Sequence, residues 1–398
     1  MRTASVNNMN LLAPPSVEAT QRWALIIGIA FGIISVILAF MQPDKFFHAY
    51  LVAYMDWLGV TLGCMALLML QHLTGGAWGM VIRRMLEAGM RTLPLMIVLF
   101  IPVVVGMPRL YFWTHPENVT GNPHLVQLTH SYLTANGFIL RAVIYFAIWW
   151  GLAYLLGRYS AQQDEPSARN LRSTFRSISA PGLILYAFTI SFAAIDWVMS
   201  LSAPWISTIY GMIFMVGECL SALCFIIIVE SLLSRREPMS ALLKPKEIHD
   251  HGKLSLAFVM LWAYFSFSQF LIYWAGNLPD EIPWYMRRLY NGWQGVGLFL
   301  VIFHFAAPFI LLLSRSFKRS ASTMIWLAAW IMLMRYVDLF WYIEPNFSTT
   351  FTVSLADIVL PIAIGGFWVA LFFRNLRQRP LLPLYDPRAR ALMDAAHE

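Results

Sequence analysis

Glu218 and His304 lie in long apolar stretches of the sequence that offer no opposite charge close by. A charged side chain near the centre of a bilayer costs about 2.5–3.5 kcal/mol on insertion scales. Groups retained at such a cost need water or a partner, and Glu and His can pass protons along chains of water. The pair therefore predicts a proton path through a membrane. Plain hydrogen bonding between helices is the structural alternative.

Further polar residues of the apolar stretches extend this set from the middle of the membrane toward one face: Asp56, Asp196, Asp338, Tyr264 and Ser268. The two hydroxyl residues are expected between Glu218 and His304, where they would hold intervening water. Asp196 precedes a tryptophan, so a position at the membrane surface is its structural alternative. We take all seven residues as candidates for the proton path.

A second group of residues could hold a quinone carbonyl: His72, Gln269 and Arg335. His72 opens the segment HLTGGAWG (72–79), whose paired glycines permit a tight turn. A proton-entry group and a helix C-terminal cap are the other interpretations of this histidine. Gln269 could equally bond to a neighbouring helix. Arg335 precedes Asp338 by three positions, so the two side chains can pair on one helix face.

The cysteines indicate no metal chemistry. Cys64, Cys219 and Cys224 all fall in apolar stretches and form neither a CxxC nor a CxxCH motif. Iron–sulfur clusters, structural zinc and covalent haem need such thiolate sets. We therefore predict no metal site, no catalytic set and no covalently bound cofactor in this chain. Any redox centre would belong to partner proteins.

The elements that position these residues follow from composition. The 398 residues are 59% hydrophobic and 12% charged, whereas a soluble domain carries about 25% charged residues. This balance excludes a soluble enzyme, a disordered chain and a secreted disulfide scaffold. A helix needs about 20 apolar residues to cross a bilayer, and ten stretches qualify: 22–41, 46–70, 91–107, 138–158, 180–200, 207–233, 254–275, 291–315, 321–342 and 354–374. The sequence predicts an all-α integral membrane protein.

Basic residues predict the orientation. Of the 28 Lys and Arg residues, 22 fall in the termini and in the segments after the second, fourth, sixth and eighth spans. Short cytoplasmic loops carry the excess of Lys and Arg. Both termini should therefore face the cytoplasm. The chain divides into a cytoplasmic N-terminal segment (1–21), a membrane domain of ten helices (22–375) and a cytoplasmic C-terminal tail (376–398). Lipid is the expected surroundings, and the net charge of +7 does not point to nucleic acid.

Three segments are expected outside the spans. The segment 108–137 is predicted as a long outer loop on which a partner could dock, and 272–290 as an aromatic cap over the outer end of two spans. Large amphipathic aromatic residues suit a buried protein contact, so Trp274, Trp284 and Tyr285 are expected to hold partners. The segment 234–253 is predicted as a basic linker on the inner side.

Three motifs carry a resemblance to a known family: HLTGGAWG (72–79), FAAIDWVMSLSAPWISTIYG (192–211) and WAYFSFSQFLIYWAGNLPDEIPWYMRR (262–288). They resemble the NrfD/polysulfide-reductase family of membrane subunits, in particular the ActF-type second quinone-binding subunits of bacterial alternative complex III. The resemblance covers about residues 20–375. It implies two four-helix bundles plus two peripheral helices, in a bacterial plasma membrane. It also implies haem c and iron–sulfur subunits on the outer side, and a sister subunit with the better-supported quinol site.

The expected function is therefore that of a membrane subunit in a quinol:electron-acceptor oxidoreductase of a respiratory or photosynthetic chain. Such a subunit would support assembly and provide a path for protons. One alternative is a quinol-oxidising site within this chain, with a menaquinone or ubiquinone as the bound cofactor. Another is a stand-alone secondary transporter, which would carry Gly- or Pro-broken spans in matching positions of two halves.

Overall fold

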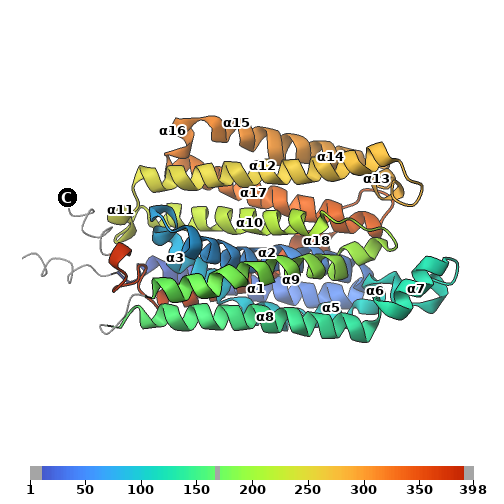
Figure 1. The fold of residues 1–398 in the computed structure, drawn as a ribbon, viewed down its shortest axis with the longest axis horizontal. Coiled ribbons are helices and arrows are strands. Elements are labelled where there is room, and N and C mark those ends of the chain that lie inside the picture. Colours follow the sequence, from blue (N-terminus) through green and yellow to red (C-terminus); the bar gives the residue numbers. More distant parts are fainter. Residues whose placement is uncertain (1–10, 166–170, 390–398) are drawn as a thin grey trace, which may run out of the picture.

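Apolar helices of membrane-spanning length account for most of the fold. The computed structural model describes residues 11–165 and 171–389, and Figure 1 shows the helices side by side along one direction. Within these residues, ten helical segments are long and apolar enough to cross a membrane. Lipid cannot satisfy free backbone groups, so a helix, which bonds its backbone internally, is the stable form of such segments. The predicted all-α membrane architecture is confirmed.

The ten spans are built from the following helices. The first five spans are α1 (Ser16–Met41), α2 (Pro43–Thr74), α3 to α5 (Ala77–Met90, Leu93–Val98 and Ile101–Val105), α8 (Ala135–Gln162) and α9 with η4 (Arg172–Trp197 and Met199–Ser202). The last five are α10 (Tyr210–Leu233), α12 (Pro245–Gly276), α14, η5 and α15 (Trp293–Leu300, Val301–Ala306 and Ala307–Leu313), α17 with η6 (Ala321–Ile343 and Glu344–Asn346) and α18 (Leu355–Arg377).

Two groups of four spans meet at the centre of the molecule. The first group contains α2, α3 to α5, α8 and α9, and the second contains α10, α12, α14 to α15 and α17. The helices α2 and α10 pack on each other between the groups and are buried along almost their whole length. A helix that is apolar all round suits such a buried position. Side chains on α2 and α10 therefore lie in the interior, away from lipid.

The helices α1 and α18 form a pair at the edge of the fold. Gly28 on α1 lies against Gly366 on α18, and a Cβ atom added at Gly28 would stand only 2.8 Å from the backbone nitrogen of Phe367. Small residues let membrane helices approach this closely, and the close packing supplies the attraction that lipid does not. The helix α1 packs chiefly on α18 and exposes most of its remaining surface.

The third span begins well before the predicted residue 91. The chain turns at Gly75 and Gly76, whose φ angles are +73° and +93°, and α3 starts at Ala77. Glycine adopts such angles without steric cost. The basic linker expected at 234–253 is also shorter, because α11 (Met239–Leu242) and the first turns of α12 occupy it. The charged residues near the starts of α3 and α12 made these segments look like loops, although both are helical.

The two segments expected to dock partners are largely folded onto the chain. In 108–137, α6 (Met107–Leu110), η2 (Phe112–Thr114), η3 (Pro116–Asn118) and α7 (Pro123–Ser131) lie at one end of the molecule (Figure 1). Tyr111 is buried there and donates its hydroxyl proton to the carbonyl oxygen of Trp197 at 2.9 Å.

The aromatic cap is likewise an internal structure. In α13 (Pro283–Met286), Trp284 stacks on Trp205 with ring centroids 4.6 Å apart, and the Arg288 guanidinium carbon lies 3.4 Å from the Trp284 ring centroid. Trp284 and Tyr285 are buried, whereas Trp274 is half exposed. Trp284 and Tyr285 therefore pack inside the chain itself, and the expectation that this segment holds partners stays a prediction.

Candidate functional site

Glu218 lies at the centre of the molecule, where α9, α10 and α2 meet. The hydroxyl of Tyr186 on α9 donates to Glu218 Oε2 at 2.7 Å. Gly59 on α2 gives the carboxyl side chain room, because an added Cβ atom would stand 3.1 Å from Glu218 Cγ. Glu218 Oε1 is buried and has no hydrogen-bond partner among the described residues. A buried carboxyl oxygen of this kind needs a proton or a water molecule.

Arg335 on α17 acts electrostatically on this carboxyl group. Its Nη1 donates to Asp338 Oδ2 one helical turn away, which confirms the predicted local pair. The guanidinium lies against Gly217, the residue before Glu218, and a Cβ atom there would overlap it. Arg335 also interacts electrostatically with Glu218 and with Asp56 on α2. We call Asp56, Glu218, Arg335 and Asp338 the central cluster.

The central cluster holds three carboxyl groups for one guanidinium. All four side chains are buried, and water would not screen their repulsion. An ionised carboxylate in such a place is costly unless it is paired. The carboxyl groups that Arg335 does not neutralise therefore favour the protonated form. The arrangement can store protons in the interior of the bundle.

His304 joins the central cluster through Trp262. The indole Nε1 of Trp262 on α12 donates to Asp338 Oδ2 at 3.0 Å, and its rings lie edge-on to the imidazole with centroids 4.3 Å apart. Both ring nitrogens of His304 are buried without a partner in the described chain. His304 sits in η5, a π-helical turn, and such turns are frequent at functional sites. No sequence signal indicated this turn.

The candidates expected between Glu218 and His304 lie elsewhere. Tyr264 on α12 is 63% exposed and faces away from the bundle. Ser268 is half-buried, and Trp262 occupies the position that had been expected for these hydroxyl groups. The prediction failed because the face of α12 that packs on α17 carries Trp262, whereas Tyr264 lies two residues further round the helix.

Asp196 forms a separate site near the end of α9. Arg141 on α8 donates to both carboxylate oxygens, from Nε at 2.8 Å and from Nη2 at 3.0 Å. The hydroxyl of Tyr145 adds a bond of 2.7 Å. A bidentate pair of this kind fixes geometry and neutralises the carboxylate. Asp196 therefore ties α8 to α9, and its place on a proton path stays a prediction.

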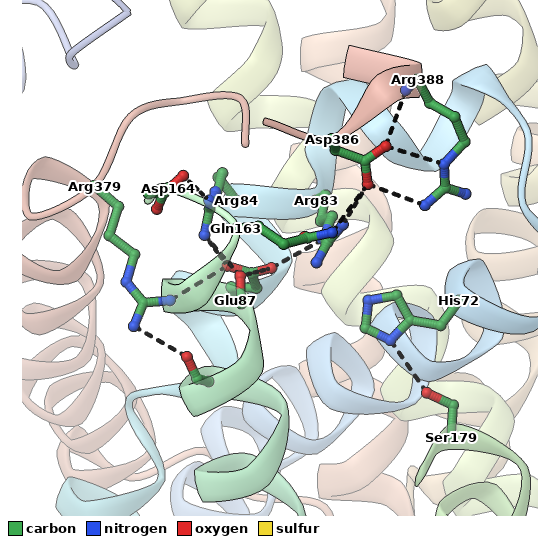
Figure 2. A network of polar contacts seen from close by, with 12 residues as sticks. His72, Arg83, Arg84, Glu87, Gln163, Asp164, Ser179, Arg379, Asp386 and Arg388 are labelled. Carbon is green, nitrogen blue, oxygen red and sulfur yellow. Dashed lines mark hydrogen bonds and ion pairs between the residues drawn. The ribbon is translucent and has the colours of Figure 1, made fainter. Parts of the chain in front are cut away.

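The opposite end of the bundle contains a polar cluster that the sequence did not reveal. Figure 2 shows Arg83, Arg84 and Glu87 of α3 buried side by side. Glu87 accepts hydrogen bonds from Arg83 Nε at 3.0 Å, Arg84 Nη1 at 2.8 Å and Ser160 Oγ at 2.6 Å. The arginines looked like loop charges because α3 was not predicted. The spacing of Glu87 three and four residues after them was the available signal.

Asp386 connects the C-terminal segment to this cluster. It accepts from Arg83 Nη1 at 3.3 Å and from Arg388 Nη2 at 3.2 Å (Figure 2). Burial disfavours its charge, but the hydrogen bonds and the positive charge of Arg388 outweigh burial and lower the pKa of Asp386 below its usual value. Asp386 therefore stays ionised and holds the C-terminal segment against α3.

His72 lies near this cluster without joining it. Its Nδ1 is 3.1 Å from Ser179 Oγ, and Phe175 packs on its ring. Nε2 is buried and has no partner in the described residues. The carbonyl of Gln71 accepts from the Gly75 N–H at the end of α2, and His72 is the basic residue in the last turn of that helix.

The three quinone candidates do not share one site. His72 lies on α2, Gln269 on α12 accepts from Ser207 at 2.9 Å, and Arg335 is engaged by Asp338. Neither of the two pockets of about 610 and 480 Å³ is lined by any of them. A quinone ring needs a cleft with converging polar groups, and the three side chains do not form one together.

Candidate metal ligands among the described residues are the His, Cys, Asp and Glu side chains. Across residues 11–165 and 171–389, no three His, Cys, Asp or Glu side chains gather as metal ligands would. Cys64, Cys219 and Cys224 are buried free thiols. Comparison with models of known families and with curated proteins finds no match to this chain. The geometry of the site is therefore the basis for a functional conclusion.

Proposed function

We propose that this chain is the membrane subunit of a quinol:electron-acceptor oxidoreductase in a bacterial plasma membrane, and that its central cluster passes protons. The observation that carries the proton path is the excess of buried carboxyl groups over Arg335 in the interior of the helix bundle. The quinol-linked part rests on the resemblance of the three motifs. Electron transfer itself belongs to haem c and iron–sulfur partner subunits.

Three residues of the central cluster, Glu218, Arg335 and Asp338, and the neighbouring His304 each have a task in this proposal. Glu218 holds the transferred proton on Oε1, and the Tyr186 hydroxyl fixes the other carboxyl oxygen. Arg335 keeps one carboxylate charged through Asp338 and so limits how many protons the cluster binds. His304, which contacts Trp262, accepts one further proton on whichever ring nitrogen is unprotonated.

A second set of polar residues continues the path toward the end that holds the C-terminal segment. Glu230 is twelve residues after Glu218 on α10, about 18 Å further along the helix. His251 Nδ1 lies 2.8 Å from Glu230 Oε1, and His251 Nε2 donates to the carbonyl of Trp78 at 2.8 Å. Water would have to span the distance between Glu218 and this pair.

The orientation is part of the proposal and has a direct test. The basic segments predict that Glu237 faces the cytoplasm and Thr120 the outside, and both side chains are exposed. In intact cells a membrane-impermeant maleimide should label Thr120→Cys and leave Glu237→Cys unlabelled until the cells are opened. The native cysteines are buried and give little background. The reverse labelling pattern would invert the orientation.

Purification tests membership of a complex. A tagged full-length chain, extracted from its native membrane in mild detergent, should bring with it cytochrome c absorbance, iron–sulfur signals and quinol-oxidising activity. The same purification from cells that express the untagged chain is the control for non-specific capture. A chain that elutes alone, without redox partners, and that transports a solute in vesicles would instead be a secondary transporter.

A further inference from the structure

A pocket of about 610 Å³ opens at the end of the bundle that holds the C-terminal segment. Its walls come from three places: the junction of α3 and α4, the last turns of α8, and the end of α18 with the residues after it. Leu93, Trp150 and Tyr154 form part of an apolar wall, and Arg91, Arg158 and Arg379 form a basic one. The pocket is therefore divided by polarity.

The division runs along the axis of α8. Trp150, Tyr154 and Arg158 follow one another at intervals of four on one face of α8. Trp150 is 46% and Tyr154 57% exposed, and the arginine stands about 12 Å beyond the tryptophan toward the end of the helix. In a bilayer crossed by α8, the apolar wall would face the lipid chains and the basic wall would lie nearer the headgroups.

The arginines of the pocket have capacity for a further ligand. Arg158 is exposed and has no partner among the described residues. Arg379 donates to the carbonyl of Gly157 at 3.2 Å, and its Nη1 lies 3.7 Å from Glu87 without a hydrogen bond. Arg91 binds Gln378 through Nη2 at 2.5 Å. Glu165 is the single acidic residue of the lining, so the pocket remains positive overall.

We propose that this pocket binds one anionic phospholipid, with its phosphate between Arg91 and Arg158 and an acyl chain along Trp150, Tyr154 and Leu93. Guanidinium groups match phosphate oxygens in geometry and charge, and basic pockets between membrane helices bind anionic headgroups. An uncharged quinone ring would not use three guanidinium groups. The inference requires only that the chain lies in a bilayer, and does not rest on the proposed redox function.

Lipid titration of the purified full-length chain tests the site. Native mass spectrometry would compare phosphatidylglycerol with phosphatidylcholine of the same acyl chains, for the unaltered chain and for Arg158→Gln and Arg91→Gln/Arg158→Gln. Arg235→Gln changes an exposed arginine at the same end, outside the pocket, and is the matched control. Circular dichroism would verify that each variant keeps its helices.

The expected result is tighter binding of phosphatidylglycerol than of phosphatidylcholine, weakened about fivefold for each arginine removed and unchanged by Arg235→Gln. Excess inorganic phosphate should not displace the lipid. Equal affinity for the two lipids, or full affinity in the double variant, would overturn the proposal. Displacement of the lipid by free phosphate or by a quinone would also overturn it and would assign the pocket to that ligand.

Discussion

Replacing Glu218 by glutamine should leave the chain folded and reduce the rate of proton translocation about 10²-fold or more. This is the smaller end of the rate loss that follows removal of a positioned proton-transfer group. Glutamine keeps the shape of the side chain and still accepts the Tyr186 hydroxyl bond. It cannot bind and release a proton. The full complex, reconstituted in vesicles, would be assayed for quinol turnover and for proton release at the same time.

Cys224→Ala is the matched control for this experiment. Cys224 is buried on the same helix six residues further on, and it carries no charge partner. Its replacement should leave both rates unchanged. If Glu218→Gln also gives unaltered turnover and proton release, Glu218 is a hydrogen-bonding residue of the scaffold, and the central cluster carries no protons.

The second large effect is expected at Arg335. Arg335→Leu removes the only guanidinium of the central cluster and leaves the Asp338 carboxylate buried without its partner. Breaking one side of a buried ion pair costs about 3–5 kcal/mol, against a total stability of about 5–15 kcal/mol for a folded protein. Folded protein in the membrane should fall sharply, as measured by fluorescence-detected size-exclusion chromatography and by thermal unfolding in detergent.

A second substitution distinguishes charge from packing at this position. Arg335→Leu combined with Asp338→Asn removes both charges, and the asparagine oxygen still accepts the indole N–H of Trp262. We expect this double variant to recover a substantial part of the thermal stability. If it unfolds at the same temperature as Arg335→Leu alone, the loss comes from the cavity beside Gly217, and the ion pair contributes little.

Much of the fold could be predicted because a bilayer restricts the backbone so strongly. Stretches of apolar residues located all ten spans, and the pairing of Arg335 with Asp338 followed from their helical spacing. The third span began earlier than expected because Arg83, Arg84 and Glu87 made its first turns look like a loop. Those charges are buried only because α8 and the C-terminal segment supply their partners, which lie far away in the sequence.

The candidate site could be predicted in its residue types but not in its connections. Glu218 and His304 were identified as unpaired groups, but Tyr186 and Trp262, which contact them, are ordinary aromatic residues in an aromatic-rich chain. Tyr264 was misplaced because a helix that is apolar all round gives no periodic signal for its buried face. The π-helical turn at His304 depends on packing that a single stretch of sequence does not encode.

The close contact of α1 with α18 sets a condition on how the chain is made. Residue 41 ends the first span and residue 355 begins the last, so about 314 residues are synthesised between them. At about 5–20 residues per second, the first span waits roughly 15 to 60 seconds for its partner. During that interval the glycine face around Gly28 has no native neighbour. The α1–α18 contact therefore forms only after the rest of the membrane domain has been synthesised, and until then α1 is held in the membrane by its own apolar surface.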